Sequence, residues 1–268
     1  MHASGQRQAV RAQHANTQHG GVFSVRHIST VASIGYRLVM TLHDSLPLTG
    51  LPAVSLVASP TKRTTILELA SRLESFGFAG LACPSLGATM GLCVSLAHTT
   101  STLRYWTSIQ PIYYNHPVEA ANTAAHIHEV SGGRFGFGIG VSHGPVVQRL
   151  GVETGKPLSD IRNYVQAMRA QEKFSGALPP IYLAALRDKM LQLSGEISDG
   201  VLLDFLLPPS YMVDASAAMQ AGIELRKDGK KEIDVTMIVS CSVNDDDPRE
   251  AIDACKAFLT LYLMQQPH

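Results

Sequence analysis

Ser131-Gly132-Gly133-Arg134-Phe135, continuing into Gly136-Phe137-Gly138-Ile139-Gly140, joins the end of a helix directly to a buried strand. A glycine just past a helix end can adopt the left-handed conformation that caps the helix, and a second glycine lets helix and strand approach closely. Upstream, residues 117–130 carry proline in the first turn and alanines at three- and four-residue spacing, which predicts a helix. This helix, loop and strand unit is typical of parallel α/β architecture.

The same alternation of short apolar runs and helix-period segments continues on both sides of this stretch. The strands are expected at 53–58, 79–83, 104–109, 135–140, 181–184, 200–204 and 233–242, and the helices at 65–76, 88–98, 117–130, 158–171, 187–194, 209–226 and 248–262. Seven βα units of about 30 residues favour a (β/α)₈ TIM barrel that lacks its eighth unit over a doubly wound sheet. Such a barrel has two open strand edges, which solvent, a partner chain or an N-terminal extension must cover.

The N-terminal segment differs from the rest, which divides the chain into an extension at 1–47 and a barrel domain at 48–268. It carries Arg7, Arg11, Arg26 and Arg37, and no acidic residue precedes Asp44. Such a composition is found in organelle transit peptides. The interpretation we favour is an extension translated from an upstream start, disordered because its scattered apolar residues cannot offset its conformational entropy.

Composition narrows the possible partners. Lys and Arg total 22 and Asp and Glu total 22, so the charge balance indicates neither nucleic acid nor an anionic membrane as partner, and we expect a small-molecule substrate. No apolar run reaches the roughly 20 residues of a membrane span. The 4 cysteines are dispersed without a Cys-x-x-Cys pair, which favours a reducing, cytoplasmic location.

Gly140-Val141-Ser142-His143-Gly144 matches Gly-x-Ser-x-Gly, the nucleophile elbow of serine hydrolases. That chemistry needs an acid and then a histidine downstream, and the only histidines beyond Ser142 are His143 and His268. A serine hydrolase is therefore the less favoured alternative. The loop follows a predicted barrel strand, so Val141, Ser142 and His143 remain candidates to contact a bound ring or phosphate.

Other polar residues have two possible roles. Arg187 and Lys189 stand where a helix begins, and they either attract a phosphate or form a solvated basic turn beside Asp188. Asn115 and His116 either line the ligand-binding end of the barrel or cap the following helix.

The pair His126 and His128 does not predict a metal site. On a helix, residues two apart point about 200° from each other, so the two rings cannot share an ion.

In these motifs the chain resembles the luciferase-like monooxygenase family. The resemblance rests on His116-Pro117, Ser131 to Phe135 with Gly138-x-Gly140, Leu150-Gly151, Lys156-Pro157-Leu158, Pro180 to Ala185, and Gly195-Glu196-x-x-Asp199-Gly200. Ser-Gly-Gly-Arg-Phe lies at the end of the barrel where the strands begin, so it identifies the fold and not the chemistry. The family continues through an eighth strand and helix, whereas this chain departs from the pattern at residues 264–268, so we expect a C-terminally truncated barrel.

The resemblance implies an oxidoreductase that uses coenzyme F420, a deazaflavin, or FMN to pass a hydride to a small organic substrate or to activate oxygen for monooxygenation. It implies a non-proline cis peptide at Ser108-Ile109 behind the cofactor ring, contacts from Gly140, Val141 and Ser142 to the ring or its side chain, and contacts from Ala185, Leu186, Arg187 and, beside them, Lys189 to the phosphate. His143 is the candidate catalytic residue, because a histidine side chain can exchange protons near neutral pH.

A different class of function stays open beside this one. The shortened, non-fluorescent relatives of luciferase bind flavin on a depleted barrel without known turnover. A non-catalytic flavin-binding protein, or an inactive truncated barrel, is therefore the alternative to the enzyme, and a homo-oligomer is one way in which the open edges could be covered.

Overall fold

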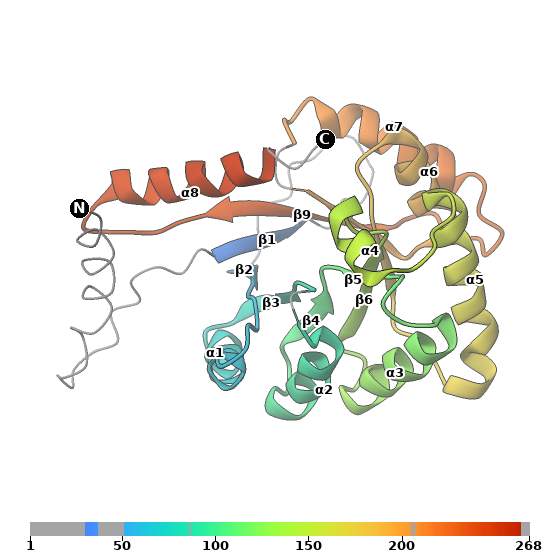
Figure 1. Cartoon of the computed structure of the whole chain (residues 1–268), viewed down its shortest axis with the longest axis horizontal. Helices are drawn as coiled ribbons and strands as arrows, with labels where there is room; N and C mark the ends of the chain where they lie inside the picture. Colours follow the sequence, from blue (N-terminus) through green and yellow to red (C-terminus); the bar gives the residue numbers. More distant parts are fainter. Residues whose placement is uncertain (1–29, 37–50, 86, 205–206, 264–268) are drawn as a thin grey trace, which may run out of the picture.

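The computed structural model describes residues 30–36, 51–85, 87–204 and 207–263. Its central feature is a sheet in which parallel strands alternate with helices (Figure 1). The parallel strands are β2 (Leu51–Ser55), β3 (Phe78–Cys83), β4 (Arg104–Thr107), β6 (Phe135–Gly140), β7 (Ile181–Ala184), β8 (Gly200–Leu203) and β9 (Asp234–Cys241). The helices that follow them are α1 (Arg63–Ser75), α2 (Thr89–Thr99), α3 (Pro117–Val130), α5 (Pro157–Ser175), α6 (Asp188–Ile197), α7 (Tyr211–Ile223) and α8 (Pro248–Leu263). The predicted TIM-barrel type with seven βα units is confirmed.

Three elements differ from the expected pattern. The predicted strand at 104–109 stops at Thr107 and resumes as the short β5 (Gln110–Pro111), which pairs with β6. The stretch between β6 and α5, expected as a loop, contains helix α4 (Gly144–Leu150). The third is β1 (Thr30–Tyr36), which lies in the segment expected to be disordered.

Strand β1 lies between the two edges that the missing eighth unit leaves open (Figure 1). It pairs antiparallel with β2, Val31 opposite Ser55, and antiparallel with β9 along its whole length. The edges of β2 and β9 carry N–H and C=O groups that need partners, and this supplies the physical reason for order at these seven residues. Solvent, a partner chain and the N-terminal segment were the three ways in which these strand edges could be covered, and the structure shows the N-terminal segment in that place. Residues 1–29 and 37–47 lie outside the described part of the chain.

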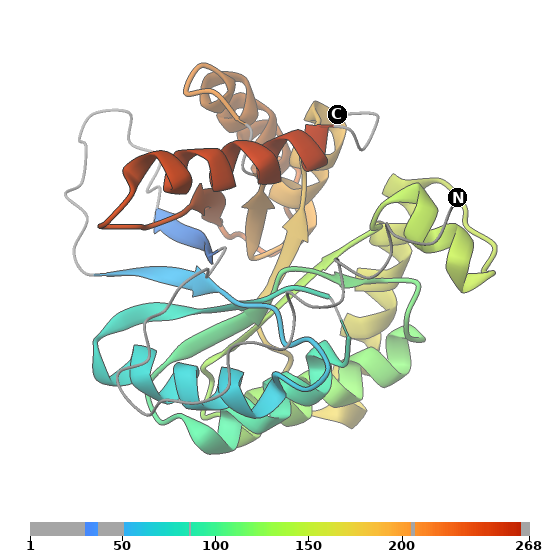
Figure 2. The ribbon, with the colours of Figure 1, turned by 60° about the vertical axis from the view of Figure 1, so that its left-hand side comes forward.

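Helices cover the outside of the sheet, with α1, α2 and α3 side by side in Figure 2. The alternation of β6 shows how the layers divide: Phe135, Phe137 and Ile139 are fully buried in the core that the sheet forms with these helices. The intervening glycines face the inside of the barrel. A Cβ on Gly138 would lie 1.9 Å from the carbonyl oxygen of Thr107, so only glycine permits β4 and β6 to approach this closely.

The predicted helix stop at Ser131–Gly133 is confirmed. Gly132 and Gly133 have φ values of 63° and 84°, and their N–H groups donate to the carbonyl oxygens of Glu129 and His128. The turn leads directly to Arg134, whose guanidinium donates five hydrogen bonds. The acceptors are the carbonyl oxygens of Ser131, Leu103, Ala97 and Thr100, and the hydroxyl oxygen of Thr100, at 2.7 to 3.0 Å.

The loop between α2 and β4 is held from a second side by Glu74 of α1. One carboxylate oxygen of Glu74 accepts the backbone N–H groups of Ser101, Thr102 and Leu103 and the hydroxyl of Thr102. Partial burial alone would raise the pKa of this carboxyl, but the hydrogen bonds from Thr102, Leu103 and Ser101 outweigh it and lower the pKa to about 2. Arg134 and Glu74 together fix where β4 begins.

Within the described residues, no helix combines the length and apolarity needed to cross a bilayer.

We predict that Arg134→Ala lowers the free energy of unfolding by about 3 kcal/mol, because several partly buried carbonyl groups lose a charged donor. Arg134→Lys should recover only part of the loss, since an ammonium lacks the planar fork. Urea denaturation measures both. Arg149→Ala is the control, because this exposed arginine makes one hydrogen bond of 3.3 Å within α4. A loss of unfolding free energy in Arg134→Ala no larger than in Arg149→Ala would contradict the role of the Arg134 hydrogen bonds.

We predict that Glu74→Gln destabilises the protein at neutral pH and that the difference from wild type shrinks in acid. The folded pKa of about 2 lies below the ordinary value of 4.5, so the carboxylate stabilises the fold above pH 4.5 and that contribution disappears as pH falls towards 2. Urea denaturation at intervals between pH 7 and the acid limit of folding tests this. Glu68→Gln, at an exposed position of the same helix, is the control. A difference that stays constant with pH would refute the electrostatic origin.

Candidate functional site

The carboxyl ends of neighbouring strands bring the predicted site residues to one end of the barrel. The N–H of Ser108, just after β4, donates to the carbonyl of Cys83 at the end of β3 at 2.9 Å. The N–H of Ile112 donates to the carbonyl of Gly140 at the end of β6 at 3.0 Å. The N–H of Ala185, after β7, donates to Leu202 of β8 at 3.3 Å. The three predicted segments therefore meet at the face where barrel proteins carry their sites.

The first segment has the backbone that the family resemblance implied: the peptide bond between Ser108 and Ile109 is cis. The Ser108 hydroxyl is buried and has no hydrogen-bond partner among the described residues. Buried hydroxyls normally have a partner, so this one is available to a ligand.

The second segment forms a narrow apolar floor inside the barrel. A Cβ on Gly140 would lie 3.0 Å from Cδ1 of Ile109 and 3.1 Å from Cβ of Ala184. A side chain at Gly140 would therefore press on the apolar side chains of Ile109 and Ala184. Together these three residues form a hydrocarbon surface, which suits the face of a planar ring.

Beyond Gly140 the chain turns through a strained residue into α4. Ser142 has φ of 65°, a left-handed conformation that is uncommon for a residue other than glycine. Val141 and Ser142 are half-buried, whereas His143 is exposed and precedes α4, its carbonyl accepting the N–H groups of Val146 and Val147. Backbone strain of this kind occurs preferentially at ligand sites.

The third segment places cationic side chains at the start of α6. Arg187 is the N-cap residue, and its carbonyl accepts the N–H groups of Met190 and Leu191 at 2.8 and 2.9 Å. Arg187 and Lys189 are exposed, while Ala185 is buried. The positive end of the helix and the two cations attract an anion, against one opposing carboxylate at Asp188. This donor set fits a phosphate.

Tyr211, the first residue of α7, fixes the loop from the other side. Its hydroxyl donates to the carbonyl of Leu186 at 2.6 Å. Burial, assisted by the negative charge of Asp188, raises the pKa of Tyr211, so the phenol keeps its proton and remains a donor at neutral pH.

Two of the sequence motifs lie away from this site. His116 is the N-cap of α3, its Nδ1 accepting the N–H of Val118 at 3.3 Å, and so has the capping role. Asn115 lines a pocket together with residues of α2, α3 and β6. His126 and His128 lie on α3, and the described residues contain no group of three or more His, Cys, Asp or Glu side chains placed to hold a metal ion.

Sequence reasoning missed the apolar residues that pack around Gly138 and Gly140 and the whole of that pocket. Ala184 and Leu202 face the inside of the barrel, close to where side chains at Gly140 and Gly138 would lie. The two-residue alternation along β7 and β8 was the available signal, but strands this short and this buried show little of it.

A parallel α/β barrel with an apolar surface and an anion-attracting helix start at its carboxyl end has the architecture of barrel proteins that bind a ligand across the strand ends. The family model described as luciferase-like monooxygenase matches residues 48–267, and the chain belongs to this family.

Individual relatives agree with this assignment. The 5,10-methylenetetrahydromethanopterin reductase of Archaeoglobus fulgidus is 31% identical over 170 residues, which cover 56% of this chain and 51% of that protein. The chain thus spans about half the length of this curated relative.

Solved structures show the same fold. The coenzyme F420 dependent tetrahydromethanopterin reductase from Methanopyrus kandleri has a TM-score of 0.68 at 22% identity, covering 81% of this chain and 73% of that one. The oxygenating constituent of 3,6-diketocamphane monooxygenase from Pseudomonas putida, solved in complex with FMN, has a TM-score of 0.56 at 14% identity, covering 64% and 62%.

We predict that Ser142→Gly raises the free energy of unfolding by up to about 1 kcal/mol, because glycine adopts positive φ without the steric cost that serine carries. Ser142→Ala removes the same hydroxyl and keeps the steric cost, so it should give no gain. Urea denaturation of the two variants separates strain from side-chain contacts. Equal stability of the glycine and alanine variants would contradict a strained Ser142.

Proposed function

We propose that the chain is an oxidoreductase that binds coenzyme F420 or FMN at the carboxyl end of the barrel and acts on a small organic substrate. The observation that carries the proposal is the convergence of the Ser108-Ile109 cis peptide, the apolar surface at Gly140 and the start of α6 at one face. The family supports it, since its relatives include an F420-dependent reductase and an FMN-bound monooxygenase. We prefer the deazaflavin, because two curated relatives at 31% and 28% identity are 5,10-methylenetetrahydromethanopterin reductases, and a solved tetrahydromethanopterin reductase is described as coenzyme F420 dependent.

Different residues would contact different parts of such a cofactor. Ile109 and Gly140 would bound the ring, the Ser108 hydroxyl would donate to it, and Val141 and Ser142 would contact the ring or its side chain. Arg187, Lys189 and the backbone of Ala185 and Leu186 would hold the phosphate. When bound, a reduced deazaflavin or flavin supplies the hydride.

The protein must also bring cofactor and substrate together and exchange the proton that accompanies the hydride. Hydride transfer needs the two reacting carbons close together in a dry slot more than it needs an acid or base. His143, exposed at the start of α4, is the proposed residue that delivers or removes the proton that accompanies the hydride. We place the protein in the cytoplasm.

We predict saturable binding of coenzyme F420 or FMN, followed by fluorescence quenching in parallel titrations. Arg187→Ala should weaken the preferred cofactor about tenfold, the value of one charge-assisted hydrogen bond to phosphate. Arg149→Ala, which removes an exposed arginine of α4, is the charge-matched control. If neither cofactor binds, or if both variants bind alike, the site assignment fails.

A second measurement separates the enzyme from the binding protein. Reduced cofactor bound to the chain is followed spectroscopically for oxidation by oxygen and by small carbonyl or imine acceptors. Oxidation faster than that of free cofactor supports the oxidoreductase, and a His143→Gln variant that binds normally but loses the acceleration supports the proton role. Binding without acceleration favours the non-catalytic alternative.

A further inference from the structure

Helix α4 lies at the carboxyl end of the barrel and is only loosely packed. It closely follows β6, and Figure 1 shows it beside the end of that strand. None of the residues of α4 is buried, whereas α1, α2, α3, α5, α6 and α7 each contribute at least two buried residues to the core. Core packing therefore does not hold α4 in place.

The segment that contains α4 is held at its two ends. Upstream, Gly140 belongs to the paired strand β6. Downstream, one carboxylate oxygen of Asp160, in the first turn of α5, accepts the N–H of Gly155 at 2.9 Å and the hydroxyl of Tyr113 at 2.7 Å. Asp160 thus anchors Gly155 to the chain that follows β5. Residues 141–154 lie between these two fixed points.

The backbone turns sharply on both sides of α4. Ser142 before the helix and Gly151 at its C-cap both have φ of 65°, in the left-handed region. Hinges in proteins are a few loop or element-terminal residues that absorb a change of backbone angle. Ser142 and Gly151 are therefore the candidate hinges about which α4 would move as a unit.

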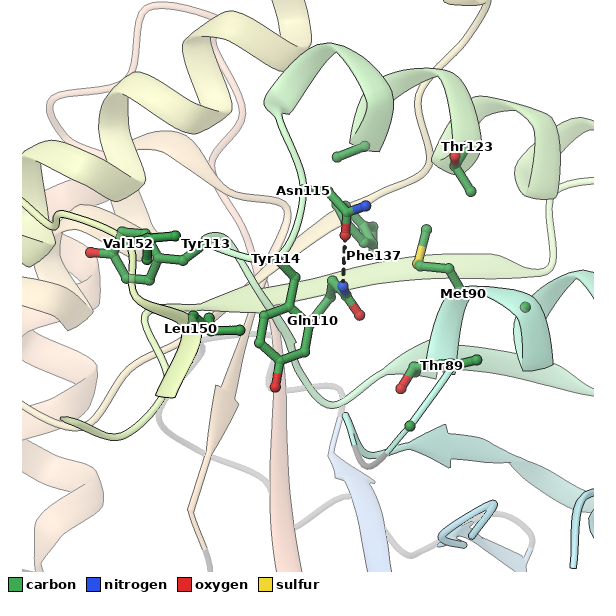
Figure 3. A pocket seen from close by; sticks show the side chains of 14 residues that line it. Thr89, Met90, Gln110, Tyr113, Tyr114, Asn115, Thr123, Phe137, Leu150 and Val152 are labelled. Atoms are coloured by element: carbon green, nitrogen blue, oxygen red, sulfur yellow. Dashed lines mark hydrogen bonds between the residues drawn. The ribbon is translucent and has the colours of Figure 1, made fainter. Parts of the chain in front are cut away.

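One face of α4 is apolar and incompletely covered. Val146, Val147 and Leu150 are three and four residues apart, which places them on one side of the helix. Val146 and Val147 are half-buried, while Leu150 is 38% exposed and Val152, just beyond α4, is 42% exposed. Figure 3 shows Leu150 and Val152 at a cavity of about 520 Å³ that Tyr113 also lines. This apolar face is therefore directed at the ligand-binding end and can still gain burial.

We propose that residues 141–154 form a lid that closes over a ligand bound at the carboxyl end of the barrel. The helix moves about its two hinges until its apolar face covers the ligand, while Asp160 holds the downstream end. A bound ring supplies the apolar surface against which Leu150 and Val152 become buried, so ligand binding and closure favour each other. The lid rests on the proposed function, since the ligand that it covers is the cofactor proposed above.

Closure would serve the chemistry of such a cofactor. A closed lid excludes water from the reacting carbons, which hydride transfer requires. An open lid lets cofactor and substrate enter and leave.

Trypsin reports the state of the lid, because Arg149 is the only lysine or arginine in residues 141–154 and is exposed. Cleavage of a helix requires local opening, so its rate measures how often α4 opens. The full chain is digested with and without coenzyme F420 or FMN, and mass spectrometry follows the fragments 1–149 and 150–268. Cleavage after Lys231, exposed before β9 at the opposite end of the barrel, is the internal control.

Cofactor at about ten times its dissociation constant should slow cleavage after Arg149 about tenfold and leave cleavage after Lys231 unchanged. Tyr113→Phe removes one hydrogen bond to Asp160 and keeps the ring, so it should speed cleavage after Arg149 in the free chain about fivefold, which corresponds to about 1 kcal/mol. Tyr114→Phe is the matched control, because this neighbouring hydroxyl is exposed and donates to no described residue. It should be cleaved like wild type.

Several results would overturn the lid. Cofactor binding that leaves cleavage after Arg149 unchanged would overturn the lid alone and leave the proposed function intact. Equal slowing after Arg149 and Lys231 would also overturn it, because that indicates general stabilisation of the fold. Equal cleavage of Tyr113→Phe and Tyr114→Phe would overturn the anchor at Asp160 and with it the hinged lid. If neither cofactor binds in the titrations, the proposed function fails and the lid fails with it.

Discussion

The hydrogen bonds of the Arg134 guanidinium are the constraint on which the rest of the barrel depends. They tie the end of α2, the start of β4 and the turn that begins β6 to one planar group. Since β4 and β6 pair directly, Tyr105 opposite Phe135, fixing both beginnings fixes the register in which their far ends meet. The position of Ser108 relative to Gly140 is therefore set at the opposite end of the barrel.

The same strands serve two different environments on their two faces. Towards the inside, Gly138 and Gly140 let backbone and apolar side chains approach closely. Towards the helices, the large side chains of β6 pack in the core, and Phe137 also lines the cavity beside Gln110. The period of two along a strand thus places close backbone packing on one face and the large side chains on the other.

Much of the fold could be predicted from local signals. The glycine stop at Gly132 and Gly133 and the alternation of apolar runs depend on neighbours in sequence, and the structure bears them out. Helix α4 was missed because a seven-residue helix between glycines presents too little periodicity. Strand β1 was missed for another reason: its order comes from the edges of β2 and β9, which are distant in sequence. The cis peptide followed only from the family resemblance, and the cavity exists only once α2, α3 and β6 are assembled.

The direction of β1 has a consequence for the ligand-binding end. In each parallel strand the chain runs upward to the mouth and leaves it through a loop, but β1 runs downward, with Thr30 opposite Cys241 and Tyr36 opposite Val235. Thr30, the first residue of β1, therefore lies at the same end of the barrel as Ser55 and Cys241, the last residues of β2 and β9. The ligand-binding end thus carries the beginning of one strand among the ends of seven others.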